Sequence, residues 1–399
     1  MKGQNSADNK KNNKNIVFSL LVTHAPLSRV ELVRLTGLSK MTITNIITEM
    51  INENLVFERD DSSAVCVAGR PPKQLSIIPK SRLIIGVYIT YNFIQTCLSD
   101  LCGTIYKSMK TPLDFHETSE TFQKKVQIAI KEIIPTDDLS KLVGIGVASV
   151  GIVHHKSGSI IEAVNFHGIH QAPVSEWIRQ VLPKPVFLDT DTNVSALGEM
   201  YFGYANDMKN FIYVGVADGI GAGIITQSRL NIGNHGYAGE FGHVSVDIHG
   251  PQCSCGNRGC LEMLASTSQI SKLAQDILSI GGTETALTSG NVSFEAIVSL
   301  AQNGDPLCVG LLRKMCFFIA TGLVNLINLL DPEAIFLGHD FVLTGETGLD
   351  MIKEFIKSRY ITSSIKEVEI RMTALSDASP LIGSVALVID KIAHNLLPL

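Results

Sequence analysis

The most informative part of the sequence reads Gly-Glu-Phe-Gly-His over residues 239–243 and Gly-Pro-Gln-Cys-Ser-Cys-Gly-Asn-Arg-Gly-Cys-Leu-Glu over residues 250–262. It gathers three of the eight cysteines into one short loop, with a histidine upstream of them. Three thiolates and one imidazole make a closed tetrahedral donor set, which structural zinc prefers. The sequence therefore predicts Zn²⁺ as a cofactor. The proposed ligands are His243, Cys253, Cys255 and Cys260.

Two other interpretations of these cysteines fit the sequence less well. Buried free thiols need apolar surroundings, whereas this loop is rich in Gly, Asn and Arg. Disulfides are typical of secreted chains, but Met1–Asn15 has no apolar core and does not resemble a signal peptide. The other cysteines lie singly in apolar patterns, which favours a reducing cytoplasm as the location.

The quoted stretch closely resembles the signature of the ROK proteins (repressors, open reading frames and sugar kinases). In that family a zinc loop lies against a sugar pocket. The resemblance covers almost the whole chain after a short N-terminal tail. It implies an α/β body with two actin-like, sugar-kinase-like (RNase H-like) lobes and a cleft between them.

Charge is distributed unevenly along the chain. Residues 1–80 hold 11 Lys and Arg against 7 Asp and Glu, a net charge of +4. Because the whole chain has a net charge of −5, the remaining residues carry −9. A basic N-terminal part on an acidic body indicates that only the N-terminal part meets a polyanion. The most apolar run, Cys316–Leu330, contains polar residues and ends at Asp-Pro, so a buried core helix is expected there and no membrane span.

The N-terminal part has the pattern of a helix-turn-helix motif. Residues 1–14 are expected to form a disordered arm. Ser28 and Glu31 have the spacing of a capping box, and Gly37 ends the helix that they begin. A second helix is predicted over Lys40–Glu53. A short helix, a glycine-containing turn and a second helix are typical of DNA-binding domains.

The second helix of this motif has two different faces. An apolar stripe is predicted to be buried, while short or polar side chains on the opposite face suit base edges and phosphates. A three-helix interaction module remains the alternative interpretation. The residues predicted to contact double-stranded DNA from this helix are Lys40, Met41, Thr42, Thr44 and Asn45.

A wing follows the helix-turn-helix pattern. Strands are predicted over Leu55–Arg59 and Gln74–Ile78, and between them Gly69-Arg70-Pro71 holds an arginine on a stiff backbone. Such an arginine suits a narrow A·T-rich minor groove, although a simple proline-stiffened linker would look the same. A winged helix, Gly-Arg-Pro and a sugar-kinase-like body together resemble the transcriptional branch of the family, typified by the xylose and N-acetylglucosamine repressors.

The body begins with three hairpin-linked strands, then a helix and a buried strand, which indicates an α/β layer fold. Its two lobes follow from the family resemblance. The predicted domains are a disordered arm over 1–14, a winged helix-turn-helix domain over 15–80, a first actin-like lobe over 81–198 with 380–399, and a second lobe with the zinc loop over 199–379.

The resemblance also implies a sugar site. Carboxylates and amides bind sugar hydroxyls because each hydroxyl both donates and accepts a hydrogen bond. Taken singly, these side chains could equally be helix caps or solvent-exposed groups. Phe166-His167 and Thr190 depart from the family pattern and leave the preferred sugar open. The sugar-binding residues that match by motif are Asn165, Asp191, Glu240, His243 and Glu262.

The phosphate loops expected of the family's kinases are incomplete. The first loop, Asp-Gly-Gly-Thr in the kinases, corresponds here to Tyr88-Ile-Thr-Tyr-Asn92, which offers no glycine and no carboxylate for magnesium. The second loop, Gly219–Gly223, is present, and His339 replaces the second glycine of a later pair. Asp191 matches the kinase base, but a base without bound ATP transfers no phosphoryl group.

These features together predict a sugar-responsive transcriptional regulator, most consistent with a repressor of carbohydrate uptake or catabolism genes. Its expected partners are operator DNA, a sugar or sugar phosphate, and further copies of the chain in a homodimer or homotetramer. No catalytic residue and no membrane contact are expected. A ROK-type kinase with an appended head and a regulator that binds another protein remain the alternatives.

Overall fold

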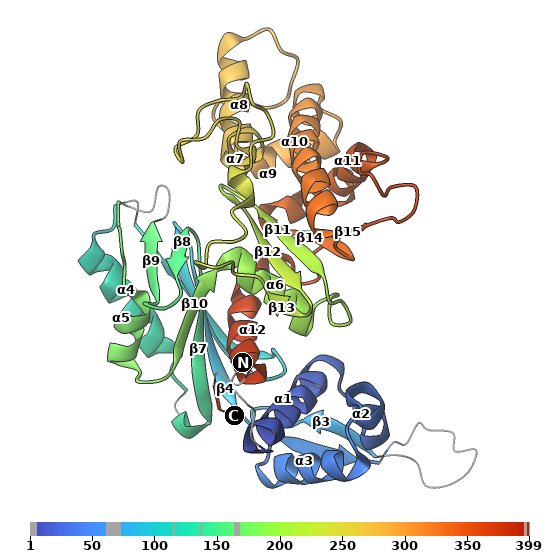
Figure 1. Ribbon diagram of the computed structural model, residues 1–399. Coiled ribbons are helices and arrows are strands. Elements are labelled where there is room, and N and C mark those ends of the chain that lie inside the picture. The colour runs from blue at the N-terminus through green and yellow to red at the C-terminus, as the bar shows by residue number, and fades with distance from the viewer. Residues whose placement is uncertain are drawn as a thin grey trace. The chain divides into compact units, whose positions relative to one another are not determined.

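The computed structural model describes residues 6–60, 73–114, 116–135, 138–162, 168–394 and 397–398. The chain divides into two compact units, one formed by residues 1–206 with 380–399 and the other by residues 207–379 (Figure 1). We call residues 6–78 the head, the rest of the first unit the first lobe, and the second unit the second lobe. The boundary predicted at 198/199 lies at 206/207 in the structure. A boundary at 198/199 would cut the helix Asp191–Phe202, which belongs wholly to the first unit.

The head has the predicted helix-turn-helix order with a small antiparallel sheet in the order β1-β3-β2. The capping box is confirmed: the Ser28 amide donates to Glu31 Oε2 at 2.7 Å, and the Glu31 amide donates to Ser28 Oγ at 3.2 Å. Gly37 ends that helix at φ 69°, and Ser39 caps the next. The elements are α1 (Ser6–His24), β1 (Leu27–Ser28), α2 (Arg29–Thr36), α3 (Lys40–Asn52), β2 (Val56–Arg59) and β3 (Gln74–Ile77).

The expected disordered arm is wrong for residues 6–14, which form the first half of α1. Ion pairs join this part of the helix to α3. Lys10 Nζ lies 2.7 Å from Glu49 Oε2, and Lys14 Nζ lies 2.7 Å from Glu53 Oε1. These partners are far away in sequence, so the local composition of residues 6–14 could not reveal them.

The first lobe is built on a five-stranded sheet in the order β10-β7-β4-β5-β6. Strands β4, β5 and β6 are joined antiparallel, whereas β7 and β10 run parallel to β4. The strands are β4 (Leu83–Ile89), β5 (Phe93–Asp100), β6 (Ile105–Pro112), β7 (Leu142–Ser149) and β10 (Val186–Thr190), with a hairpin of β8 (Ile152–His154) and β9 (Ser159–Glu162). The helices are α4 (Ser119–Ile133), η1 (Leu139–Lys141), α5 (Val174–Val181), α6 (Asp191–Phe202) and α12 (Ser379–Ala393).

The second lobe repeats this topology. Its sheet order is β13-β12-β11-β14-β15, so in both lobes the first strand is central, a hairpin pair lies on one side and two parallel strands on the other. The repeated order agrees with the predicted two-lobed fold. The strands are β11 (Phe211–Val216), β12 (Ile220–Thr226), β13 (Arg229–Leu230), β14 (Ala334–Gly338) and β15 (Glu369–Met372). The helices are η2 (Phe241–His243), α7 (Leu261–Ala265), α8 (Thr267–Ile280), α9 (Phe294–Gln302), α10 (Pro306–Leu330), η3 (His339–Thr344), α11 (Gly345–Ile356) and η4 (Ser376–Ala378).

Among the described residues, α10 is the one helix long and apolar enough to cross a membrane by length and composition. Half of its most apolar window is buried inside the protein. Leu312, Met315 and Ile319 of α10 belong to the core of the second lobe. This is the pattern of the core helix that the sequence predicts.

The C-terminal helix α12 returns to the first lobe and packs on its sheet beside β4 and β7 (Figure 1). The contact leaves no room for side chains. A Cβ added at Gly146 of β7 would lie 1.8 Å from the Ser384 carbonyl oxygen, and one added at Gly86 of β4 would lie 2.6 Å from Ser384 Oγ. The two glycines therefore set how closely the last helix approaches the sheet.

We expect Gly146→Ala to destabilise the protein by about 3 kcal/mol, because either α12 or β7 must shift to admit the methyl group. Equilibrium urea unfolding would measure the loss. Gly290→Ala is the matched control, since a Cβ there has no neighbour within 4 Å. An unchanged midpoint for Gly146→Ala would contradict the tight contact of α12 with the sheet.

Candidate metal and nucleic-acid sites

Four predicted metal ligands lie together in the second lobe. One donor atom from each of His243, Cys253, Cys255 and Cys260 lies within 4.8 Å of all the others. The Cys255 and Cys260 sulfurs are 3.7 Å apart, and Cys253 Sγ lies 3.6 Å from His243 Nδ1. Ideal tetrahedral zinc bonds would place two sulfurs about 3.8 Å apart, and a sulfur and an imidazole nitrogen about 3.6 Å apart. The donor set and its spacing therefore fit a zinc ion.

Tight backbone turns hold the ligands. The Cys253 amide donates to the Asn257 carbonyl at 2.8 Å, and the Gly256 amide donates back to the Cys253 carbonyl at 3.0 Å. Gly256 has φ 93°, which a residue with a side chain rarely adopts. At Gly259, with φ 62°, an added Cβ would lie 1.6 Å from the Asp247 carbonyl oxygen. Only glycine fits at position 259, and it places Cys260 at the start of α7.

The pKa values of two of the thiols are shifted in opposite directions. Burial raises the pKa of Cys260 to about 12, and the neighbouring thiols act in the same direction. The backbone amide of Asn257 lowers the pKa of the exposed Cys255 thiol by hydrogen bonding to it. A cation at the centre of the cluster favours the thiolate form of every ligand, so metal binding would release protons.

Glu262 ties the cysteine loop to the glycine turn between β11 and β12. Its Oε2 accepts a hydrogen bond from the Ile220 amide at 3.0 Å. A Cβ at Gly219 would lie 3.2 Å from the same oxygen, and one at Gly242 would lie 2.4 Å from the Ile220 carbonyl oxygen. Sequence reasoning did not find this contact. The glycines at 219 and 242 were its signal, because they permit the close approach of the two loops.

The predicted sugar residues are divided between the units. His243 and Glu262 lie in the second lobe beside Gly242, and Glu240 directly precedes η2. Asp191 is the first residue of α6 in the first lobe, where its Oδ1 accepts from the Thr192 amide at 2.8 Å. Asn165 lies outside the described residues. The structure thus brings three of the set together in one unit, and the complete sugar site stays a prediction.

The predicted DNA-contacting residues of α3 face away from the core of the head. Lys40, Thr44 and Asn45 are exposed, Met41 is 76% exposed, and Thr42 is half-buried. The opposite face carries the buried stripe of Ile43, Ile46, Ile47 and Met50, as predicted. Arg70 lies outside the described residues.

A contact that the sequence did not reveal fixes the exposed face of α3. Arg29 Nε lies 2.7 Å from Glu58 Oε1 of β2, and the same guanidinium donates to the Thr44 carbonyl at 3.5 Å. Arg29 therefore joins the start of α2 to both α3 and the first wing strand.

The turn that corresponds to the kinases' first phosphate loop is closed on itself. Thr90 Oγ1 accepts hydrogen bonds from the amides of Asn92 and Phe93 at 3.2 and 3.1 Å. The rings of Tyr88 and Phe93 meet edge to face, with centroids 5.8 Å apart. The amides of Asn92 and Phe93 thus donate within the turn.

Three comparisons show which known proteins this chain is similar to. The family model described as "ROK family" matches residues 84–391. The xylose repressor of Bacillus spizizenii is 30% identical over 383 residues, which cover 96% of each chain. A crystal structure of a ROK family transcriptional regulator, a homologue of Escherichia coli Mlc, superposes with a TM-score of 0.82 at 24% identity over 97% of both chains. A ROK glucokinase of Streptomyces griseus, solved with glucose and AMPPNP, gives a TM-score of 0.67 at 26% identity, covering 76% of this chain and 98% of its own.

We expect Cys255→Ser to lose bound zinc, from about one ion per chain to nearly none, because the hydroxyl is a poor fourth ligand. Metal analysis of the purified protein by mass spectrometry would measure the stoichiometry. Cys102→Ser is the matched control, since Cys102 is exposed and outside the cluster. Full zinc content in Cys255→Ser would overturn the ligand assignment.

Proposed function

Because this chain belongs to the ROK family and matches a xylose repressor over nearly its whole length, we propose that it is a sugar-responsive transcriptional repressor. The observation that carries the proposal is the head itself. It presents the polar, exposed residues of α3 on a rigid helix-turn-helix, whereas the glucokinase matches only 76% of the chain. Its targets would be genes of carbohydrate uptake or catabolism, in the cytoplasm.

The DNA complex follows from the face of α3. Helix α3 would enter the major groove, where Asn45 and Thr44 can hydrogen-bond base edges and Lys40 a phosphate. Met41 supplies an apolar surface for a thymine methyl group, and Arg70 would reach the minor groove. A homodimer or homotetramer would present two heads to two half-sites, which must lie at fixed helical intervals.

A sugar or sugar phosphate would be the effector. Asn165, Asp191, Glu240, His243 and Glu262 are the proposed binding residues. A zinc ion held by His243 and the three cysteines would supply a fixed orientation for the imidazole. Glu262 is oriented by the Ile220 amide, so two of the proposed sugar contacts are held in place before the ligand arrives.

The same body is proposed to lack kinase activity. The closed Thr90 turn occupies the amides that would hold a phosphate. His339, at the later glycine position, has φ 57°, a conformation that favours glycine, and its Nδ1 lies 3.2 Å from the Tyr213 hydroxyl. Phosphoryl transfer depends on positioning the nucleotide, and we infer that the closed Thr90 turn and the His339 side chain both oppose it. ATP consumption in the presence of hexoses would contradict this part of the proposal.

A gel-shift titration at fixed salt tests DNA binding, with DNA from upstream of this gene as the probe. We expect Asn45→Ala to weaken specific binding by roughly 5- to 150-fold, the value of one good base contact, with little change on unrelated DNA. Asn92→Ala, an exposed asparagine of the first lobe, is the matched control. Equal losses on both DNAs would contradict base recognition by Asn45.

We expect Asp191→Ala to abolish the response of the protein–DNA complex to sugar while operator affinity without sugar stays within about threefold of wild type. The carboxylate is proposed to bind sugar hydroxyls and lies outside the head. Titration with D-xylose, D-glucose, N-acetylglucosamine and their phosphates would measure the response. A normal response in the variant would place the sugar pocket elsewhere.

A further inference from the structure

Helix α6 is buried along almost its whole length. Every residue from Thr192 to Tyr201 is buried, although the segment includes Asn193, Ser195 and Glu199. It packs against β7 and β10 of the sheet and against α1 of the head. On the α12 side, a Cβ at Gly383 would lie 2.2 Å from the Val194 carbonyl oxygen. A helix enclosed in this way moves as a body and displaces its neighbours when it moves.

The two ends of α6 have different surroundings: one carries a proposed sugar contact, and the other lies near the head. Its first residue is Asp191, the proposed sugar contact. Ten residues later, roughly 15 Å along the helix, Tyr201 is only 4% exposed. Its hydroxyl donates to Asp390 Oδ1 of α12 at 3.4 Å, and α6 also packs against α1 of the head. The end of α6 is therefore joined to α12 by a buried polar contact.

Polar contacts also join α1 to the lobe and to α3. The Asn15 side chain, which is buried, donates to the Ile392 carbonyl of α12. On the other side of α1, Lys14 bridges to both Glu49 and Glu53 of α3. Buried hydrogen bonds are directional and costly to leave unpaired, so a shift of α6 that moves Tyr201 is passed to α1 and then to α3.

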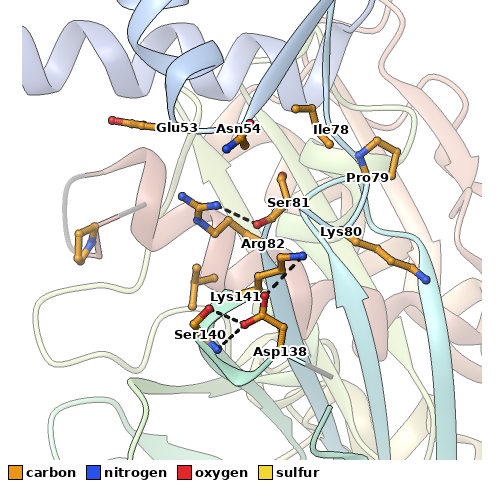
Figure 2. Close-up of a pocket in the computed structure, with 12 residues that line it drawn as sticks. Glu53, Asn54, Ile78, Pro79, Lys80, Ser81, Arg82, Asp138, Ser140 and Lys141 are labelled. Atoms are coloured by element: carbon orange, nitrogen blue, oxygen red, sulfur yellow. Dashed lines mark hydrogen bonds and ion pairs between the residues drawn. The ribbon is translucent and has the colours of Figure 1, made fainter. Parts of the chain in front are cut away.

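A second polar contact lies directly after the head, at its junction with the first lobe, and involves no residue of α6. The Lys80 amide donates to Asp100 Oδ2 at 3.1 Å, and the Tyr106 hydroxyl donates to the same oxygen at 2.5 Å. Beside it lies a cavity of about 720 Å³ between the end of α3 and η1 (Figure 2). Asn54 lines it from the head, and Arg82 and Lys141 line it from the first lobe. The end of α3 therefore borders a space that other side chains do not fill.

We propose that the Tyr201 hydroxyl is the group through which occupancy of the site at Asp191 changes the position of the DNA-binding head. This inference rests on the proposed function, since it assumes that Asp191 contacts the sugar. Tyr201 acts as a positioning residue: it touches neither the ligand nor DNA, and it holds α6, α12 and α1 in one arrangement.

The test compares Tyr201→Phe with Tyr106→Phe. Both remove a hydroxyl that donates to a buried aspartate at the joint between head and lobe, but Tyr201 alone lies on α6. Operator affinity is measured with and without D-xylose, D-glucose, N-acetylglucosamine and their phosphates. Ligand affinity is measured by calorimetry with and without operator, since coupling between two sites is reciprocal.

In the wild type we expect an active sugar to change operator affinity by roughly 5- to 150-fold, the usual range of coupling. In Tyr201→Phe both the effect of sugar on operator binding and the effect of operator on sugar binding should fall to within about twofold of none. Sugar affinity without DNA should remain unchanged. Tyr106→Phe should keep the wild-type coupling. Full coupling in Tyr201→Phe, or an equal loss in both variants, would overturn the proposal.

If no compound in the panel changes operator affinity, that result counts against the proposed sugar response and not against the role of Tyr201. A second measurement, made without sugar, tests the role of Tyr201 by itself. Hydrogen exchange of the amides in α1 is followed after Asp191→Ala, in proteins with Tyr201 and with Tyr201→Phe. We expect Asp191→Ala to change exchange in α1 only where Tyr201 is present. Exchange in α1 that ignores Asp191→Ala, or responds to it equally in both proteins, would refute the relay.

Discussion

The close approach of α12 to the sheet of the first lobe is the constraint on which the first unit depends. Gly146 admits the Ser384 carbonyl where a methyl group would collide with it. On its opposite side α12 presents Gly383 to α6 and Asp390 to Tyr201, and its end accepts the Asn15 side chain of the head. One helix from the far end of the chain thus joins the sheet, the buried helix α6 and the DNA-binding head, because the packing leaves it a single position.

What could be predicted from the sequence was set by short-range chemistry. Ser28 and Glu31 are three residues apart, and the cysteine ligands lie within one loop, so spacing alone identified both the capping box and the metal cluster. The helix over residues 6–14 was missed because its ion-pair partners, Glu49 and Glu53, lie more than thirty residues away. The link from Glu262 to Ile220 was missed for the same reason. Local sequence patterns therefore identify the candidate ligands, whereas contacts between residues far apart in the sequence determine how the side chains are positioned.

The body that this chain shares with sugar kinases illustrates how one fold serves two functions. Both sheets keep the order of three hairpin strands followed by two parallel strands. The change lies in single turns. The Thr90 side chain accepts the amides of its own turn, and His339 occupies a backbone conformation suited to glycine. Under the proposed function, such changes would weaken nucleotide binding while the topology of both lobes is kept.

A ligand can change the state of a protein only through contacts that differ between two arrangements. In the second lobe, His243 lies in the metal cluster and Glu262 accepts from the Ile220 amide, so these two proposed sugar contacts are held in place. In the first lobe, Asp191 begins a helix that cannot deform because all of its middle is buried. The joint between head and lobe differs from both places, because a cavity borders it near the end of α3. Under the proposed function, binding of a sugar would therefore act on the head through this joint.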